Sequence, residues 1–530
     1  MKTGTWITFV VLALLLVILP ACSIAPGTSH ATQAPYQDNY YAAPNEPVTI
    51  MPVMGETFGP STGGTHEPND QPYGLVFFEN YGVNPRIDTE DDRFSTFAVD
   101  VDTASYTIMR RIIGDGYLPN KDSVRVEEYI NYFDQDYAIP DESAFAISID
   151  GAPSPYAENY HLVRIGVQGY EVAPEARPDV VLTFVIDVSG SMNMENRLGL
   201  VKESLTLLVE QLRPTDRIGI VVYGSDARVV LASTPVANSR VIAQAIERLQ
   251  AEGATNVEEG LRVAYRLARE NFDHTAINRV ILCSDGVGNV GRTGHNSIWE
   301  QVAADAAGGI YLTTVGFGMG NYNDTLMEQL ADNGDGFYAY VDDIKEAERI
   351  FVHRLPSSLQ VIARDAKVQV EFNPAVVSRY RLIGYENRAI ADEDFRNDAV
   401  DAGELGPGHS VTALYEVKFL SAADSQALAL MVYLRWEDPD TREVTEISQG
   451  ITPTDFSSDF RQSSPHFQLT VVVAQYAEIL RESYWATDTG TTLAEVAQDA
   501  HRVAEYMPQD ADVQEFAQIA VAAIELSTTR

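Results

Sequence analysis

The sequence predicts an α/β protein, in which a doubly wound, mostly parallel sheet is inserted in a β-rich domain that ends in a helical C-terminus. Between Pro178 and about Leu355, continuous apolar runs alternate with segments of helical period. Repeated strand–helix units of this kind specify an open parallel sheet with helices on both faces. Segments of β-type pattern both precede and follow this region. We therefore infer that they form one β-rich domain that is interrupted by the α/β domain.

The α/β region opens on the continuous apolar run 180–186, which is the pattern of a strand buried on both faces. Apolar residues from Leu198 to Leu212 then recur at the spacing of one helix face. The same reasoning predicts further strands at 218–223, 228–232 (its hairpin partner), 279–283 and 310–315, and helices at 241–249 and 257–268.

The flanking segments follow a different pattern. Before the α/β region we expect a strand at 94–99, helices at 103–114 and 124–133, and paired strands at 144–149 and 160–167. After Leu355 the helical period stops, and alternating residues indicate strands at 360–372, 380–385, 410–419 and 427–436. The chain ends in two stretches of helical pattern, at 467–484 and 492–526.

The first residues have the pattern of an export signal. The apolar stretch from Trp6 to Leu19 is too short for a comfortable membrane span. Leu19-Pro20-Ala21-Cys22 then looks like a bacterial lipobox with Cys22 as the lipid acceptor, although Pro20 departs from the usual small residue. A signal peptide cleaved elsewhere is the alternative. Either pattern predicts an exported protein, and the first predicts a lipid anchor that holds it to a membrane of the cell envelope.

Composition divides the rest of the chain. Residues 23–92 are rich in Pro, Gly, Thr, Asn and Tyr and lack an apolar period, which predicts a disordered tether. The full division that we expect is a lipoprotein signal peptide at 1–22, the tether at 23–92, an N-terminal region at 93–175, the α/β domain at 176–356, a β-rich domain at 357–455 and a helical segment at 456–530.

The formal net charge of −39 limits the partners. Binding to nucleic acid needs a basic face that neutralises phosphates, so we expect no nucleic-acid partner. A solvated acidic exterior that keeps an exported protein soluble is the simpler interpretation. Of the two cysteines, Cys283 lies inside an apolar run, where we expect a small buried hydrophobic residue rather than a disulfide or a nucleophile.

Oxygen-bearing side chains follow the buried strands of the α/β region. Asp187, Ser189 and Ser191 come directly after the first strand, in a tight turn to which Gly190 would give flexibility. In an open α/β sheet, ligands bind beyond the carboxyl ends of the strands. One carboxylate and two hydroxyls are an incomplete shell for a hard cation, which takes about six oxygen ligands. Two further loops supply candidates, namely Thr255 before one helix and Asp285 after another strand.

Together the three loops resemble the metal-ion-dependent adhesion site of the von Willebrand factor type A domain, with its D-x-S-x-S, its Thr and its Asp-Gly. The resemblance implies a Rossmann-like sheet and a site for Mg²⁺, with Mn²⁺ or Ca²⁺ as alternatives. It implies that Ser189, Ser191 and Thr255 coordinate the ion directly, while Asp187 and Asp285 act largely through water. An acidic side chain of a protein partner would then complete the coordination shell of the ion.

The resemblance extends to both flanks. The stretches 94–106 and 125–133 look like the N-terminal region of bacterial envelope proteins that carry this domain. The stretches 381–388, 401–404 and 408–416 look like their C-terminal domain of unknown function. The resemblance thereby covers nearly the whole chain beyond the tether, but it does not bring a settled biological role.

These patterns favour a lipid-anchored binding protein rather than an enzyme. An accessory subunit of an ATP-driven or metal-inserting assembly is the alternative, although an exported protein cannot serve a cytosolic ATPase. A hydrolase is the third class. Asp100-Val101-Asp102 resembles a phosphatase motif, but Ala104 stands where that motif has Thr or Val. Neither Ser189 nor Ser191 lies in G-x-S-x-G, and no histidine is placed as a base.

Two acidic segments have simpler interpretations. Asp102 or Thr103 is expected to cap the helix that follows. The stretch 332–336 hints at calcium, but it lacks the twelve-residue loop with a closing Glu. We expect it to be an acidic turn before a strand.

Overall fold

The structure is a computed structural model that describes residues 78–99, 101–140, 143–173, 176–286, 296–318, 324–354, 359–439 and 441–528. The expected signal peptide with Cys22, the larger part of the expected tether, and Asp100 lie outside the described residues. Among the described residues, no helix is both long enough and apolar enough to cross a membrane.

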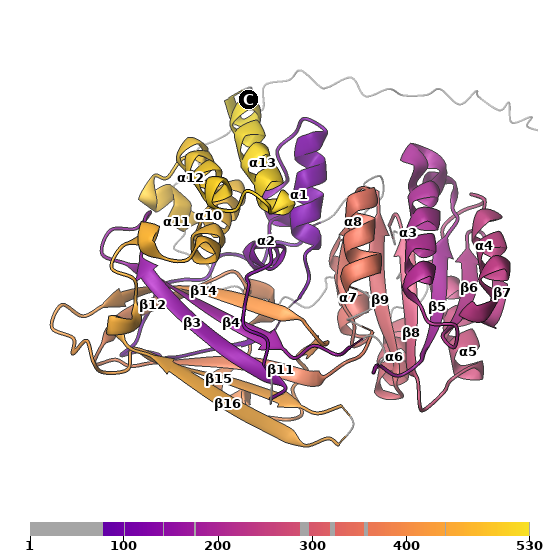
Figure 1. Ribbon diagram of the computed structural model, residues 1–530, viewed down its shortest axis with the longest axis horizontal. Helices are drawn as coiled ribbons and strands as arrows, with labels where there is room; N and C mark the ends of the chain where they lie inside the picture. The colour runs from indigo at the N-terminus through magenta and orange to yellow at the C-terminus, as the bar shows by residue number, and fades with distance from the viewer. Residues whose placement is uncertain are drawn as a thin grey trace, which may run out of the picture. The chain divides into compact units, whose positions relative to one another are not determined.

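The inserted domain is built on one sheet with the strand order β10-β9-β8-β5-β6-β7 (Figure 1). Its strands are β5 (Val180–Asp187), β6 (Arg217–Tyr223), β7 (Ala227–Pro235), β8 (Ile277–Ser284), β9 (Ile310–Phe317) and β10 (Tyr338–Val341). All neighbours pair in parallel except β7, which forms the expected antiparallel hairpin with β6. The predicted mostly parallel sheet is therefore confirmed, and β10 is the strand that we expected after the acidic turn at 332–336.

Helices cover both faces of this sheet. Along β5, Phe184 faces one hydrophobic core and Val185 faces another, because successive side chains of a strand point to opposite faces. The first core is closed by α3 (Arg197–Gln211), α4 (Ser239–Glu247) and α8 (Ile344–Glu348), and the second by α5 (Val257–Glu270), α6 (Asn296–Ala307) and α7 (Asp324–Asp332). Cys283 is fully buried on β8, as expected of a small hydrophobic residue.

The rest of the strands form two antiparallel sheets. The first has the order β1-β12-β14-β4-β3, and the second has β13-β11-β15-β16, with β2 also paired to β11. Their bounds are β1 (Ile87–Asp88), β2 (Phe94–Ala98), β3 (Phe145–Pro153), β4 (His161–Gly169), β11 (Ala363–Phe372), β12 (Val377–Ile383), β13 (Gly403–Leu405), β14 (Ser410–Phe419), β15 (Leu430–Glu437) and β16 (Val444–Ile451).

Strands from before and after the inserted domain pair with one another. β4 pairs with β14, β2 with β11 and β1 with β12, all antiparallel. The two sheets share one core, in which Phe372 of β11 stacks on Tyr380 of β12 with ring centroids 4.1 Å apart. This arrangement confirms that one β-rich domain is interrupted by the α/β domain.

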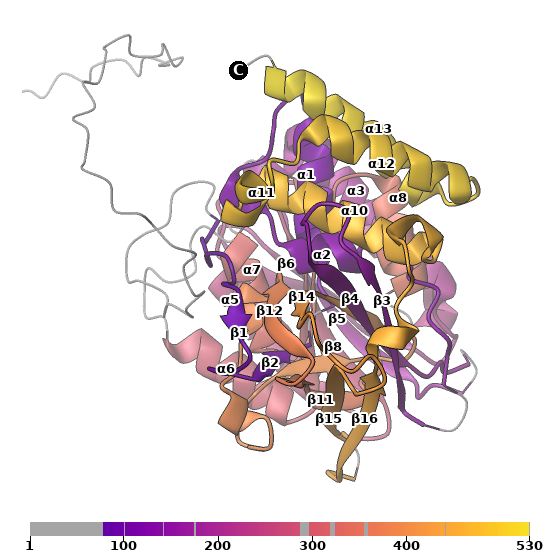
Figure 2. The same ribbon diagram turned by 90° about the vertical axis from the view of Figure 1, so that its left-hand side faces the viewer.

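Helices pack on the outer face of the first sheet (Figure 2). They are α1 (Ala104–Gly114), α2 (Val126–Asn131), α10 (Pro465–Leu480), α11 (Tyr484–Thr489), α12 (Leu493–Tyr506) and α13 (Ala511–Thr528). Leu162 and Leu414 alternate with core-facing neighbours and point to these helices. The helical C-terminus is confirmed, but the stretch 492–526 is divided into α12 and α13 around Pro508, which cannot continue a helix.

The segment that leads into α1 joins the inserted domain to the β-rich domain. Asp102 Oδ1 accepts the N–H of Tyr338 on β10 at 2.9 Å. Thr103 stands at the N-cap position of α1 but makes no capping hydrogen bond through its side chain, and instead accepts from Arg354 at 2.7 Å. The capping role expected for Asp102 or Thr103 was therefore wrong. The carboxylate of Glu128 accepts the N–H of Ser105 in the first turn instead.

Residues 78–92, which we placed in the tether, make specific contacts. The strand β1 pairs with β12, and Arg86 lies between the rings of Tyr160 and Trp485 while it pairs with Glu416 at 2.8 Å. A stretch without apolar period still docks here, because it adds an edge strand and one buried cation rather than a hydrophobic face. Neither of these two features produces an apolar period in the sequence.

Candidate metal centre

The turn that follows β5 lies at the point where the strand order of the sheet reverses. From β5 the chain continues to β6 and β7 on one side, while β8, β9 and β10 lie on the other. The crevice beyond such a switch point is where open α/β sheets bind ligands. Asp187, the last residue of β5, is 0% exposed at this edge.

The D-x-S-x-S turn brings its three oxygen-bearing side chains together. The N–H of Ser189 donates to Asp187 Oδ1 at 2.7 Å, and the hydroxyls of Ser189 and Ser191 lie 3.0 Å apart. The buried Met192 holds the next turn, with its N–H bonded to the carbonyl of Ser189. Gly190 does not adopt a positive φ, so the flexibility that we expected of it is not required by the backbone.

The loop that carries Thr255 lies against this turn. The N–H of Gly190 donates to the carbonyl oxygen of Gly253 at 3.1 Å. Gly253 has a φ of +79°, and a Cβ there would lie 2.7 Å from the backbone nitrogen of Ser225, so glycine is needed at this position. Directly after Thr255, Asn256 caps α5 by accepting the N–H of Glu259. Thr255 is thereby fixed between a tight turn and a helix start.

The third loop follows β8, which is the other neighbour of β5. The hydroxyl of Ser284 lies 3.0 Å from Asp187 Oδ2 and also accepts the N–H of Gly286. This contact ties the β8 loop to the first carboxylate. Asp285 is 2% exposed, and its negative charge acts on Asp187. The structure therefore brings the turn of Asp187 beside both of the loops that the sequence reasoning selected.

Sequence reasoning missed an arginine in the site. Arg197, the first residue of α3, donates from Nη1 to Asp285 Oδ2 at 2.7 Å. Its side chain is only 5% exposed. A cation at a helix N-terminus opposes the helix dipole, so an arginine there was a signal that a carboxylate lies nearby. Ser284 was also missed, because one more serine beside an Asp-Gly pair carries no distinctive pattern.

The electrostatics of the site favour a cation. Burial raises the pKa of Asp187 to about 6, the hydrogen bonds of Ser189 oppose this rise, and the charge of Asp285 adds to it. The pKa of the neighbouring Tyr223 phenol is raised by burial and then by the charge of Asp187. Within the described ranges Asp187 forms no ion pair. The arginine of the site, Arg197, pairs with Asp285 instead. A buried carboxylate beside two hydroxyls and without a counter-ion fits a hard divalent metal.

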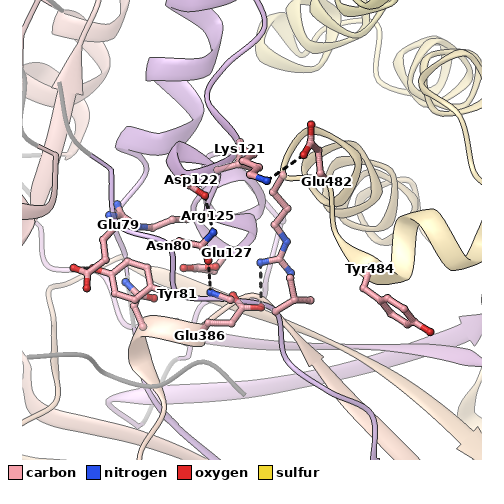
Figure 3. Close-up of a pocket in the computed structure, with 15 residues that line it drawn as sticks. Glu79, Asn80, Tyr81, Lys121, Asp122, Arg125, Glu127, Glu386, Glu482 and Tyr484 are labelled. Atoms are coloured by element: carbon pink, nitrogen blue, oxygen red, sulfur yellow. Dashed lines mark hydrogen bonds and ion pairs between the residues drawn. The ribbon is translucent and has the colours of Figure 1, made fainter. Parts of the chain in front are cut away.

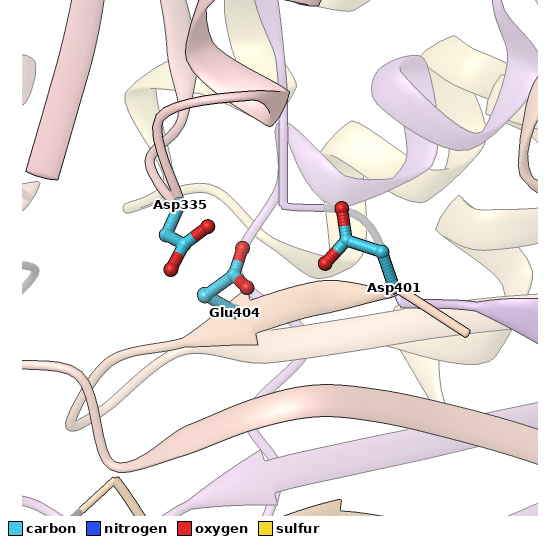
Figure 4. A group of neighbouring side chains, drawn as sticks. All are labelled: Asp335, Asp401 and Glu404. Atoms are coloured by element: carbon cyan, nitrogen blue, oxygen red, sulfur yellow. The ribbon is translucent and has the colours of Figure 1, made fainter. Parts of the chain in front are cut away.

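A second group of carboxyls also has metal-like spacing. Asp335, Asp401 and Glu404 offer oxygen atoms within 4.8 Å of one another, where the turn before β10 meets the β13 region (Figure 4). Arg364 already pairs with Asp335 at 2.7 Å. Burial raises the pKa of Asp401 to about 6 and that of Glu404 well above its usual range, and neighbouring carboxylates add to both shifts. The stretch 332–336 is an acidic turn before a strand, as predicted.

A polar pocket of about 250 Å³, drawn in Figure 3, has no lining residue from the inserted domain. It is lined by the segment around Tyr81, the start of α2 and the turn after α10. Its wall contains the ion pairs Lys121–Glu482 at 3.3 Å and Arg481–Glu386 at 3.0 Å. None of the five predicted site residues lines it, so we do not assign the function to this pocket.

Family models of known proteins match three parts of the chain. The family model described as von Willebrand factor type A domain matches residues 182–287, which include all five predicted positions. A model described as von Willebrand factor matches 76–164, and one described as Uncharacterized protein YfbK, C-terminal, matches 357–525. This last model spans the second half of the β-rich domain together with the C-terminal helices. The chain is a von Willebrand factor type A domain protein with a YfbK-type C-terminal domain of unknown function.

The relatives then define the family. Uncharacterized protein YfbK of Escherichia coli (strain K12) is 35% identical over 441 residues, which cover 78% of this chain and 76% of the relative. The chain therefore belongs to the YfbK family. Uncharacterized protein sll0103 of Synechocystis sp. is 25% identical over 309 residues, or 57% of this chain and 71% of that protein. A solved von Willebrand factor type A protein from Catenulispora acidiphila covers 71% of this chain at 18% identity, with a TM-score of 0.41.

Proposed function

We propose that this protein binds a partner through a divalent metal held by Asp187, Ser189, Ser191, Thr255 and Asp285, and that it is not an enzyme. The hydroxyls of Ser189, Ser191 and Thr255 would bind the ion directly, and the two carboxylates would hold its water ligands. Mg²⁺ is the ion that we expect, with Mn²⁺ or Ca²⁺ as substitutes. The observation that carries the proposal is the buried carboxylate of Asp187 at the switch point, beside two serine hydroxyls.

The charge balance supports an acidic group on the partner. A bound divalent ion and the guanidinium of Arg197 would bring three positive charges to the two carboxylates of Asp187 and Asp285. One positive charge then remains unneutralised at a partly exposed edge, where Ser191 and Thr255 reach solvent. A carboxylate from a partner neutralises that charge and supplies an oxygen ligand to the ion.

Metal-dependent capture tests this function. The immobilised protein is incubated with a solubilised extract of the cell envelope, in Mg²⁺ and then in excess chelator. We expect partners that are held in Mg²⁺, released by chelator and displaced by acetate, since a free carboxylate competes for the same coordination position. Asp187→Asn should capture none of them. Capture that is equal in chelator, or equal for Asp187→Asn, would show that the metal takes no part in partner binding.

We also propose that the protein is exported and anchored to a membrane of the cell envelope by lipid on Cys22. The support is the apolar stretch that ends in Leu19-Pro20-Ala21-Cys22. Cys22→Ser is expected to move the protein from the membrane pellet to the soluble fraction, because one side-chain change removes the acceptor of the lipid. Fractionation followed by immunoblotting measures this, with Cys283→Ser as the matched control that should stay in the pellet. Membrane retention of Cys22→Ser would refute the anchor.

A further inference from the structure

The guanidinium of Arg197 is held deep in the metal centre. It lies on Asp285, with the two side chains 5% and 2% exposed and 2.7 Å between Nη1 and Oδ2. Its second partner, the more exposed Glu195, is 3.7 Å away, and Nε has no hydrogen-bond partner among the described residues. An arginine that is buried, incompletely bonded and placed at a helix N-terminus is costly. The carboxylate of Asp285 is what offsets that cost.

The backbone around Arg197 leaves space for its side chain. Glu195 and Asn196, just before it, both adopt left-handed conformations, with φ of 49° and 59°, so that α3 starts with Arg197 turned toward the β8 loop. Across the site, a Cβ on Gly318 would lie 2.2 Å from Arg197 Nε, and the φ of +86° at Gly318 also favours glycine. Two non-glycine residues with left-handed backbones therefore set the start of α3, and one glycine leaves room for the guanidinium of Arg197.

We infer that Arg197 is a built-in counter-cation of the metal centre, which neutralises Asp285 in the metal-free protein and weakens the binding of divalent metal. This inference rests on the proposed metal site. The guanidinium donates a hydrogen bond to Oδ2 of Asp285, an atom that would otherwise hold a metal-bound water. Its positive charge also repels the incoming ion. The metal-free site is thereby stabilised, and the ion is held more weakly than the five oxygen-bearing residues alone would hold it.

The test compares Mn²⁺ binding and metal-free stability in the full chain. Arg197→Gln should bind Mn²⁺ at least about tenfold more tightly than the wild type in titration calorimetry, because a unit charge a few ångströms from a divalent ion has a large effect in a partly buried site. The same variant should unfold at a lower temperature than the wild type in chelator, and Mn²⁺ should recover the loss. Arg111→Gln is the matched control, since it removes a nearby arginine whose ion pairs among the described residues are with the exposed Asp115 and Glu195. This variant should bind Mn²⁺ as the wild type does.

The outcomes separate this inference from the proposed function. If the wild type binds Mn²⁺ and Arg197→Gln binds it equally or more weakly, the counter-cation role is overturned while the metal site stands. If neither protein binds Mn²⁺, the metal site itself fails. Should Arg197→Gln not fold, Arg197→Lys carries the test, because it keeps the charge but not the forked geometry. Its affinity is expected to exceed that of the wild type by a smaller factor, and an unchanged affinity would overturn the inference.

Discussion

Replacing Asp187 by asparagine is expected to lower the affinity of the protein for Mg²⁺ and Mn²⁺ by about a hundredfold, the loss found when a residue that orients the ligands of a metal is removed. Asp187 holds the Ser189 N–H at 2.7 Å and lies 3.0 Å from the Ser284 hydroxyl, and it is the carboxylate of the site without an ion pair among the described residues. Asparagine keeps the size and one acceptor oxygen, so the turn should remain folded. Titration calorimetry of the two proteins measures the difference.

Two further variants sharpen this prediction. Ser191→Ala should weaken metal binding more mildly, since a water molecule can take the place of a partly exposed hydroxyl. Asp335→Asn removes a carboxylate from the second acidic group and should leave the affinity unchanged. Loss of binding in Asp335→Asn with normal binding in Asp187→Asn would move the metal to the second group and refute the site that we propose.

Replacing Glu478 by glutamine is expected to lower the free energy of unfolding by about 3–5 kcal/mol, the range found when a buried ion pair loses one partner. Glu478 is 2% exposed and binds Arg381 at 3.0 Å, Ser483 at 2.8 Å and Arg481 at short range. In Glu478→Gln, the buried guanidinium groups of Arg381 and Arg481 lose the negative charge that they share. Urea denaturation monitored by circular dichroism measures the change.

The same carboxylate predicts a loss of stability in acid. Burial alone would raise the pKa of Glu478, but Arg481 and Arg381 outweigh it and lower the pKa from 4.5 to about 2. A depressed carboxyl pKa contributes stability that is complete above pH 4.5 and is lost as the pH falls toward about 2. The wild type should therefore lose more stability over this interval than Glu478→Gln does.

The control for Glu478 is a glutamate from the next turn. Glu482 pairs with Lys121 at 3.3 Å, but its side chain is 68% exposed. An exposed ion pair contributes about 0–1 kcal/mol, so Glu482→Gln should be close to the wild type. Equal stability of Glu478→Gln and Glu482→Gln would show that the buried network does not hold the C-terminal helices to the β-rich domain.

The fold could be predicted from the sequence because its strongest signals are local. The mostly apolar run of β5 and the period of α3 specify the central sheet and its cover without knowledge of distant contacts. The short β10 could be expected only from the acidic turn before it, because four residues give too little period to distinguish a strand. The role of Asp102 was predicted wrongly because its partner, the N–H of Tyr338, is 236 positions away in the sequence.

The candidate site was predictable in part. Asp187, Ser189 and Ser191 are close in sequence, and the order of the strands explains why the loops of Thr255 and Asp285 meet them. Arg197 could not be assigned from spacing, because its contact with Asp285 depends on the left-handed turn at Glu195 and Asn196. The acidic group of Asp335, Asp401 and Glu404 likewise exists only once the two domains are in contact.

Anomalous diffraction from crystals grown or soaked in Mn²⁺ tests the central claim most directly. The result that we predict is one manganese ion within coordination distance of the hydroxyls of Ser189, Ser191 and Thr255, with Asp187 and Asp285 reached through water. The contradicting result is the absence of manganese at this turn, whether the ion lies instead among Asp335, Asp401 and Glu404 or binds nowhere in the protein.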